Sequence, residues 1–88
     1  MPRYIIERSA AGLTRDELTA AGKRSVAVLA GMPEVRWIRS YISDVEGKIY
    51  CEYDAPSLDA IREHARLAGM TADVISEIAL EINPAMFL

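Results

Sequence analysis

The segment "VRWIRSYISDVEGKIYCEYD", Val35–Asp54, decides the predicted fold. Its first part, up to Ser43, is dense in β-branched and aromatic residues, which favour a strand. Its last part, "KIYCEYD", alternates with the period of two that is typical of a half-buried strand. Between them lies "DVEG", in which Gly47 can adopt the positive φ of a tight turn. Two strands joined by so short a turn form an antiparallel hairpin.

The chain before the hairpin predicts a strand followed by a helix. "RYIIER", residues 3–8, is short, β-branched and aromatic, and small residues follow it. Thr14 and Glu17 then have the spacing of a capping box, so a helix begins there. The helix ends near Gly31 and Pro33, because proline cannot continue it.

The chain after the hairpin repeats this order in reverse. "PSLDAIREHARLAG" has Ser57 as a cap, an acidic first turn and Gly69 at its end, so it predicts a second helix. "VISEIALEI", residues 74–82, alternates with Ile78, Leu80 and Ile82 on one side, which predicts a last strand over the whole segment.

The resulting order of elements is βαββαβ. With right-handed crossovers this order gives an α+β fold of the ferredoxin-like kind, a four-stranded antiparallel sheet with two helices on one face. The same fold builds the subunits of dimeric α/β barrels. No linker or repeat interrupts the order, so residues 1–88 form one domain.

Bulk composition excludes several classes of protein. The net charge is −3 and no basic patch stands out, which argues against nucleic acid as a partner. RNA-recognition modules share this element order, but "GKIYCEY" lacks their glycine and aromatic spacing. No apolar run is long enough to span a membrane, the N-terminus does not resemble a signal peptide, and the single cysteine cannot form an internal disulfide. We therefore expect a cytoplasmic protein.

One sheet face is left uncovered by the two helices, and this predicts a homodimer. If the more apolar side of each strand meets the helices, the open face mixes apolar and charged side chains, and a second copy is the most economical cover. The expected residues are Ile5, Ile38, Ile42, Tyr50, Arg36, Glu7, Glu52 and Glu77. The C-terminal "NPAMFL" is expected to dock on the partner or on its own sheet edge.

The only histidine, His64, lies on the apolar side of the second helix. A step of about 100° per residue separates it from the arc formed by Asp59, Arg62, Glu63 and Arg66. Its neighbours one turn away are all apolar, so no second ligand stands at metal-binding spacing. We consider first a buried neutral histidine bonded to a carbonyl, hydroxyl or thiol, second a histidine in a ligand pocket, and third a metal ligand.

The first helix carries Ser25 at the centre of its apolar face, beside the small residues Ala21 and Gly22. Both helices lie on the same sheet face, so Ser25 and His64 are expected to point at one row of strand residues. The candidate ligand pocket is therefore His64, Tyr41, Tyr53, Arg39, Ser25 and Cys51. A Ser–His or Cys–His nucleophile pair is disfavoured, because no nucleophile-elbow signature surrounds either residue.

The opening "MPRYIIER", the hairpin strands "WIRSYISD" and "KIYCEYDAPS", and "AIREHARLAGM" followed by "ISEI" together resemble a family of small bacterial ferredoxin-like proteins of unknown function. One member of that family is described as a nickel-responsive, nickel-binding protein. The resemblance implies a homodimer that binds a divalent metal at the dimer surface. Nickel favours imidazole and carboxylate ligands. Here it would need His64 with Glu63, or carboxylates across the dimer, and we expect the binding to be weak or absent.

Two functions remain open at this point. The first is a small dimeric binding protein with weak nickel or other divalent-metal affinity and no catalysis of its own. The alternative is a cofactor-independent enzyme, an isomerase, cyclase or monooxygenase acting on a small aromatic or polyketide-like substrate. In the enzyme, proton transfer would be carried out by His64, Tyr41, Tyr53 and Arg39. This hypothesis depends on fold analogy.

Overall fold

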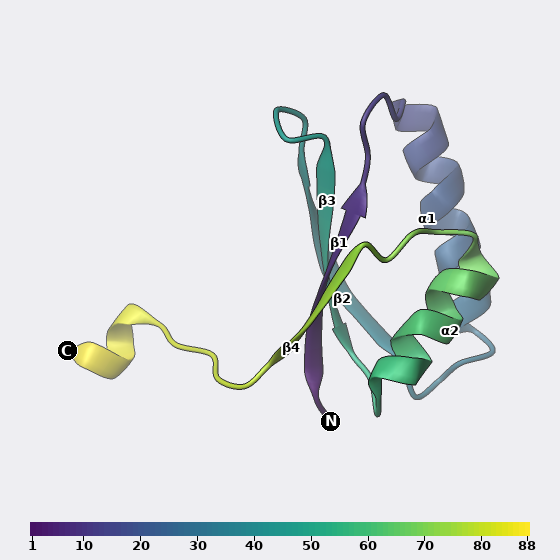
Figure 1. Ribbon diagram of the computed structural model, residues 1–88. Coiled ribbons are helices and arrows are strands. Elements are labelled where there is room, and N and C mark those ends of the chain that lie inside the picture. The colour runs from purple at the N-terminus through teal and green to yellow at the C-terminus, as the bar shows by residue number, and fades with distance from the viewer.

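The predicted order of elements is present in the computed structural model, which describes residues 1–88. Figure 1 shows the sheet almost edge-on, with both helices on one side of it. The elements are β1 Arg3–Ser9, α1 Arg15–Leu29, β2 Arg36–Ser43, β3 Lys48–Asp54, α2 Leu58–Ala68, β4 Val74–Ile78 and the short 3-10 helix η1 Pro84–Phe87. The sheet order is β2-β3-β1-β4 with every pair antiparallel, so the fold is ferredoxin-like.

Both helix starts follow from their capping residues. Thr14 Oγ1 accepts from the Glu17 N–H at 3.1 Å, while the Glu17 carboxylate accepts from the Thr14 N–H at 3.3 Å. Ser57 Oγ accepts from the Ala60 N–H in the same way at the start of α2. α2 ends at Gly69, whose φ of 67° is the left-handed value that ends many helices. Neither helix has the length and apolarity that a bilayer-spanning helix requires.

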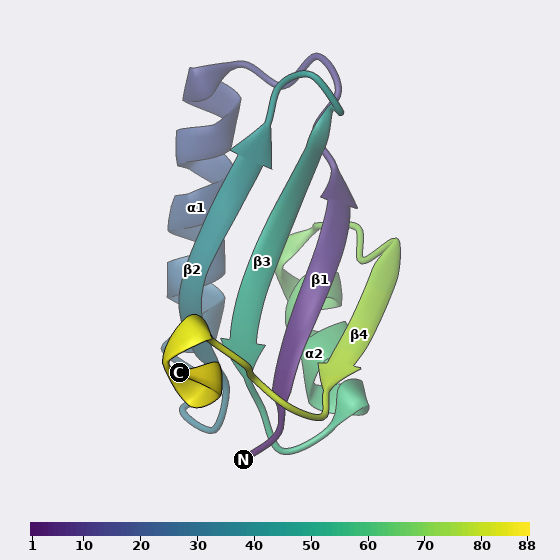
Figure 2. The same ribbon diagram turned by 90° about the vertical axis from the view of Figure 1, so that its left-hand side faces the viewer.

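The hydrophobic core lies mainly between the sheet and α2 and is completed by residues at the C-terminal end of α1 and just after it. Ile6 of β1, Tyr53 of β3, and Ile61 and His64 of α2 are the largest fully buried side chains. The longer helix α1 buries only Ser25. Figure 2 views the molecule with the sheet in front of both helices, with α1 behind β2 and α2 behind β1 and β4.

A β-bulge in β2 changes which side chains face the helices. Trp37 lies opposite Tyr53, but Arg39 lies opposite Glu52, so the extra residue at the bulge is Ile38. An inserted residue reverses the alternation after it. Ser40 and Ile42 therefore share the helix-facing side with their partners on β3, and Arg39 and Tyr41 lie on the open face.

The prediction that placed Tyr41 and Arg39 among the helix-facing residues was therefore wrong. So was the placement of Ile42 on the open face. Each error is the one-residue shift that the bulge produces, and the amino-acid pattern of "VRWIRSYIS" does not mark where the bulge falls.

The last strand is shorter than predicted, because its partner runs out. Ile78 pairs with Arg3, the first residue of β1, and Pro2, the next residue towards the N-terminus, has no N–H to donate. The chain leaves the sheet there, and Leu80 and Ile82 are 72% and 60% exposed. Within β4 the helix-facing residues are Ile75 and Glu77, opposite Ile6 and Tyr4. Glu77 was expected on the open face, and Tyr4 Oη donates to its carboxylate at 3.2 Å instead.

Candidate functional site

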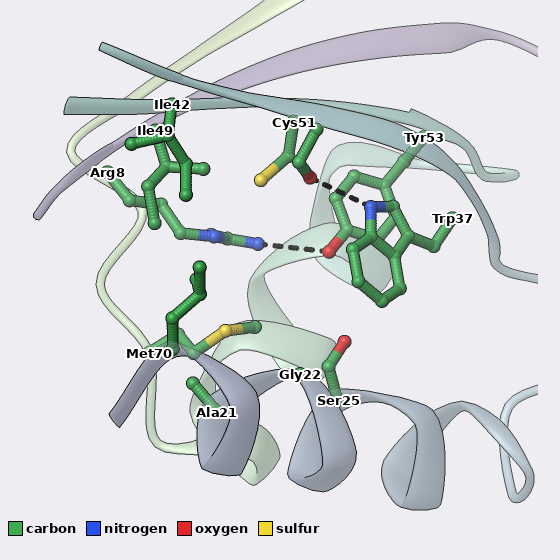
Figure 3. A pocket seen from close by; sticks show the side chains of 12 residues that line it. Arg8, Ala21, Gly22, Ser25, Trp37, Ile42, Ile49, Cys51, Tyr53 and Met70 are labelled. Atoms are coloured by element: carbon green, nitrogen blue, oxygen red, sulfur yellow. Dashed lines mark hydrogen bonds between the residues drawn. The ribbon is translucent and has the colours of Figure 1, made fainter. Parts of the chain in front are cut away.

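A pocket of about 280 Å³ lies between α1 and the helix-facing side of the sheet (Figure 3). It exists because α1 presents small residues there: a Cβ built on Gly22 would meet no atom within 4 Å. Most of the lining is apolar. The apolar members are Leu18, Ala21, Gly22, Trp37, Ile42, Ile49, Cys51 and Met70, and the polar ones are Arg8, Ser25, Ser40 and the Tyr53 hydroxyl.

Arg8 is the only charged residue of the lining, and it is buried. Its position on β1 alternates with Tyr4 and Ile6, so it faces the helices, and it is 4% exposed. Nη1 donates to the Thr71 carbonyl at 2.8 Å and Nη2 donates to Tyr53 Oη at 3.4 Å. Nε has no partner, and no carboxylate lies within ion-pair distance. Figure 3 shows the guanidinium extending across the pocket towards the Tyr53 hydroxyl.

Tyr53 is the polar group opposite Arg8. Burial raises the pKa of its phenol, and the Arg8 guanidinium and the Ser25 hydroxyl oppose that change. The Arg8 guanidinium carbon also lies 5.8 Å from the centre of the Tyr53 ring, within the range of a cation–π contact. A neutral phenol thus holds the guanidinium in place without neutralising its charge.

His64 lies beneath this group and does not line the pocket. Its Nε2 is 3.1 Å from Ser25 Oγ, which joins α2 to α1, and its ring centre is 5.3 Å from that of Tyr53. Burial, with the Arg8 charge adding to it, lowers the pKa of His64, so the ring is neutral near pH 7. Nδ1 is buried without a partner. Because an unpaired lone pair costs less than an unpaired N–H, we assign the proton to Nε2, which then donates to Ser25 Oγ.

The structure brings together only part of the predicted pocket. Ser25, Cys51 and Tyr53 line it, while His64 lies one layer below, in the buried, hydroxyl-bonded position that was considered first. The bulge places Tyr41 and Arg39 on the other side of the sheet.

The predicted metal pair is not assembled. Glu63 accepts hydrogen bonds from Arg66, which hold the pKa of its carboxyl below the ordinary value, and it lies on the exposed side of α2. His64 is fully buried and lies about 100° further round the helix. Nowhere in residues 1–88 do three His, Cys, Asp or Glu side chains gather as metal ligands would.

Sequence reasoning missed Arg8, Trp37 and Met70. For Arg8 a signal was present, because alternation along "YIIER" places a charged residue on the same side as Tyr4 and Ile6. A charge on the buried side of a strand indicates either a buried ion pair or a ligand. Met70, beyond the end of α2, carries no comparable signal.

Comparison with known proteins places the chain in a family. The family model described as "Nickel responsive protein SCO4226-like" matches residues 4–78. The chain belongs to this family. Among solved structures it is similar to SCO4226 from Streptomyces coelicolor A3(2), with 28% identity over 91% of this chain and 99% of that chain and a TM-score of 0.80. No curated protein matches the chain.

The surroundings of His64 do not fit the nickel in the family's description. Its only imidazole is sealed in the core, with Nε2 bonded to Ser25 and no carboxylate or thiolate beside Nδ1. Nickel would need several such donors around one point. Neither the pocket lining nor the surroundings of His64 therefore bring together a set of nickel ligands.

Proposed function

We propose that the protein is a small binding protein that holds an organic ligand in the pocket beneath α1 and has no catalysis of its own. The pocket is the observation that supports this. Its volume of about 280 Å³ is close to the lower end, roughly 300 Å³, of small-molecule sites. Apolar walls with a few polar groups at one point are the arrangement by which such sites bind and orient a ligand.

The enzyme alternative is less well supported. Of the four residues expected to handle protons, only Tyr53 lines the pocket, because His64 lies below it and Tyr41 and Arg39 lie across the sheet. The Ser25–His64 hydrogen bond resembles half of a catalytic triad, but no third group orients Nδ1. The burial that lowers the pKa of His64 also makes it a poor base.

We also propose that two copies form a homodimer through the open sheet face. Residues 79–88 extend away from the body on the side opposite the helices (Figure 1). Their apolar side chains are uncovered in one copy: Leu80, Ile82, Met86, Phe87 and Leu88 are all more than half exposed. A second copy on the open face would lie within reach of this segment and cover it.

Nickel affinity at His64 is, in this proposal, weak or absent. The support is the sealed position of the imidazole, and the family's description is the reason to measure it. We keep the cytoplasm as the proposed compartment, because the only cysteine is a free thiol.

The pocket can be tested with its own reporter. Trp37 is the only tryptophan and lines the pocket, so its fluorescence changes when a ligand enters. A panel of small apolar compounds, some neutral and some anionic, is titrated into the wild type and into Gly22→Leu, whose side chain fills the pocket. We expect compounds that shift the wild-type spectrum and leave the variant unchanged. If no compound does so, or the filled pocket responds equally, the proposal fails.

The homodimer has a separate test. Sedimentation of the full chain at micromolar concentration should give the mass of two copies, and Phe87→Ser with Leu88→Ser should weaken the association. A monomeric wild type would exclude the dimer and leave the pocket proposal unaffected.

A further inference from the structure

The Arg8 guanidinium is a buried cation without a counter-ion. Removing a charge from water costs several kcal/mol unless an opposite charge compensates it. Arg3, on the same strand but on the open face, has this compensation, with Asp54 at 3.0 Å and Glu52 at 3.9 Å. Arg8 has only a carbonyl and a phenol as partners. Its surroundings therefore lack one negative charge.

A ligand with a negative charge could reach the Arg8 guanidinium through the pocket, because Arg8 is part of its lining. A guanidinium has five N–H hydrogens, and the structure assigns two of those of Arg8 to Thr71 and Tyr53. The guanidinium is also the only charge in the lining, so the polar part of the pocket is positive and the rest is apolar. A ligand that matches has one anionic group and an apolar body.

We infer that the pocket binds a small organic carboxylate, with its acid group on Arg8 and its hydrocarbon part against Leu18, Ile42 and Met70. A planar carboxylate suits a guanidinium, which it can meet with two parallel hydrogen bonds. A phosphate dianion matches less well, because only one cation faces its two negative charges and the other polar groups of the lining are neutral hydroxyls. This assignment rests on the proposed function, whose pocket it uses.

The test compares two probes of one shape, cyclohexylpropionate and cyclohexylpropionamide. Neither absorbs where Trp37 is excited, so the quenching or shift of its emission measures binding to the pocket directly. We expect the acid to bind the wild type at least roughly tenfold more tightly than the amide, the ratio that one additional charge-assisted hydrogen bond provides. Acetate and inorganic phosphate, which lack the apolar body, should bind more than roughly tenfold more weakly than the acid.

Two variants locate the preference. Arg8→Met keeps an unbranched apolar stem in place of the first part of the arginine side chain and removes the charge, so acid and amide should bind it equally. Arg8→Lys keeps a charge and should retain part of the preference. If Arg8→Met does not fold, the acid-to-amide ratio in the wild type and in Arg8→Lys still decides the question.

The possible failures are distinguishable. Equal binding of acid and amide to the wild type would overturn the carboxylate and leave the pocket standing. An acid preference that persists unchanged in a folded Arg8→Met would also overturn it. Binding of neither probe, with a silent screen of other compounds, would remove the pocket proposal itself.

Discussion

The two helices lie on the same face of one sheet and pack against it in opposite ways. α2 buries four of its 11 residues, namely Ile61, His64, Ala65 and Ala68, whereas α1 buries only Ser25 of its 15. The difference comes from side-chain size, since α1 places Ala21 and Gly22 where α2 places an isoleucine and an imidazole. Close packing under α2 stabilises the fold, and the space left under α1 is the pocket. α2 therefore provides most of the close packing, and α1 borders the pocket that we propose binds a ligand.

The largest effect should come from removing the main anchor of α2. Ile61 is fully buried, so Ile61→Ala loses its contacts and leaves a void, at a cost of about 2–5 kcal/mol in the free energy of unfolding. Leu18→Ala, on the pocket wall of α1, should cost less than about 1 kcal/mol, because that side chain is only partly buried. Urea unfolding of both variants measures the difference. Equal losses would mean that the helices share the core and that the contrast between them is wrong.

The next effect depends on pH and concerns His64. Its pKa is lowered in the folded state from the ordinary 6.5, so below about pH 6.5 the unfolded chain binds a proton that the folded chain excludes. Stability should therefore fall as the pH drops from 7 to 5, and it should fall less in His64→Leu, which cannot titrate. Arg3 lowers the pKa of Asp54, which acts at lower pH and equally in both proteins. Parallel curves of unfolding free energy against pH would contradict the assignment.

Features that depend on interactions between residues near in sequence could be predicted, and features that depend on pairing between distant segments could not. Capping at Thr14 and the inward phase of His64 depend on neighbours within one or two helical turns, and both were predicted correctly. The side of the sheet on which Tyr41 and Arg39 lie was predicted wrongly, because it depends on a bulge that only the pairing of β2 with β3 reveals. The end of β4 depends in the same way on where β1 begins.

The pocket, too, depends on contacts between segments that are distant in the sequence. The sequence places the small residues Ser25 and Gly22 on the apolar face of α1, and in the structure a space lies between this part of the helix and the sheet. Whether small residues let two elements meet or leave a gap depends on what the other side offers. Here the guanidinium of Arg8 and the hydroxyl of Tyr53 lie under α1. Covering these polar groups with apolar side chains would cost free energy.

Glycines on the two helices should respond in opposite directions to the same substitution. Gly22 is in the interior of α1 with open space at its Cβ, so Gly22→Ala should raise the free energy of unfolding by about 0.5–1 kcal/mol through helix propensity. Gly69 ends α2 with a φ of 67°, so Gly69→Ala should lower it by about 1 kcal/mol. Thermal unfolding of the two variants beside the wild type gives both signs in one experiment. A destabilising Gly22→Ala would show that the space under α1 does not admit even a methyl group.

The smallest expected effect is that of nickel on α2. Because the imidazole of His64 is sealed against Ser25 and Tyr53, nickel should change the midpoint of thermal unfolding by the same small amount in the wild type and in His64→Gln. Glu63→Gln, on the exposed side of α2, should also behave like the wild type, since Glu63 is already paired with Arg66. Calorimetric titration with nickel gives the affinity independently. If nickel bound the wild type tightly and this binding were lost in His64→Gln, α2 would have to move away from the sheet to expose the buried imidazole. Tight binding kept in all three proteins would instead place the metal on carboxylates of the open face or between two copies, because the chain has no second imidazole to offer.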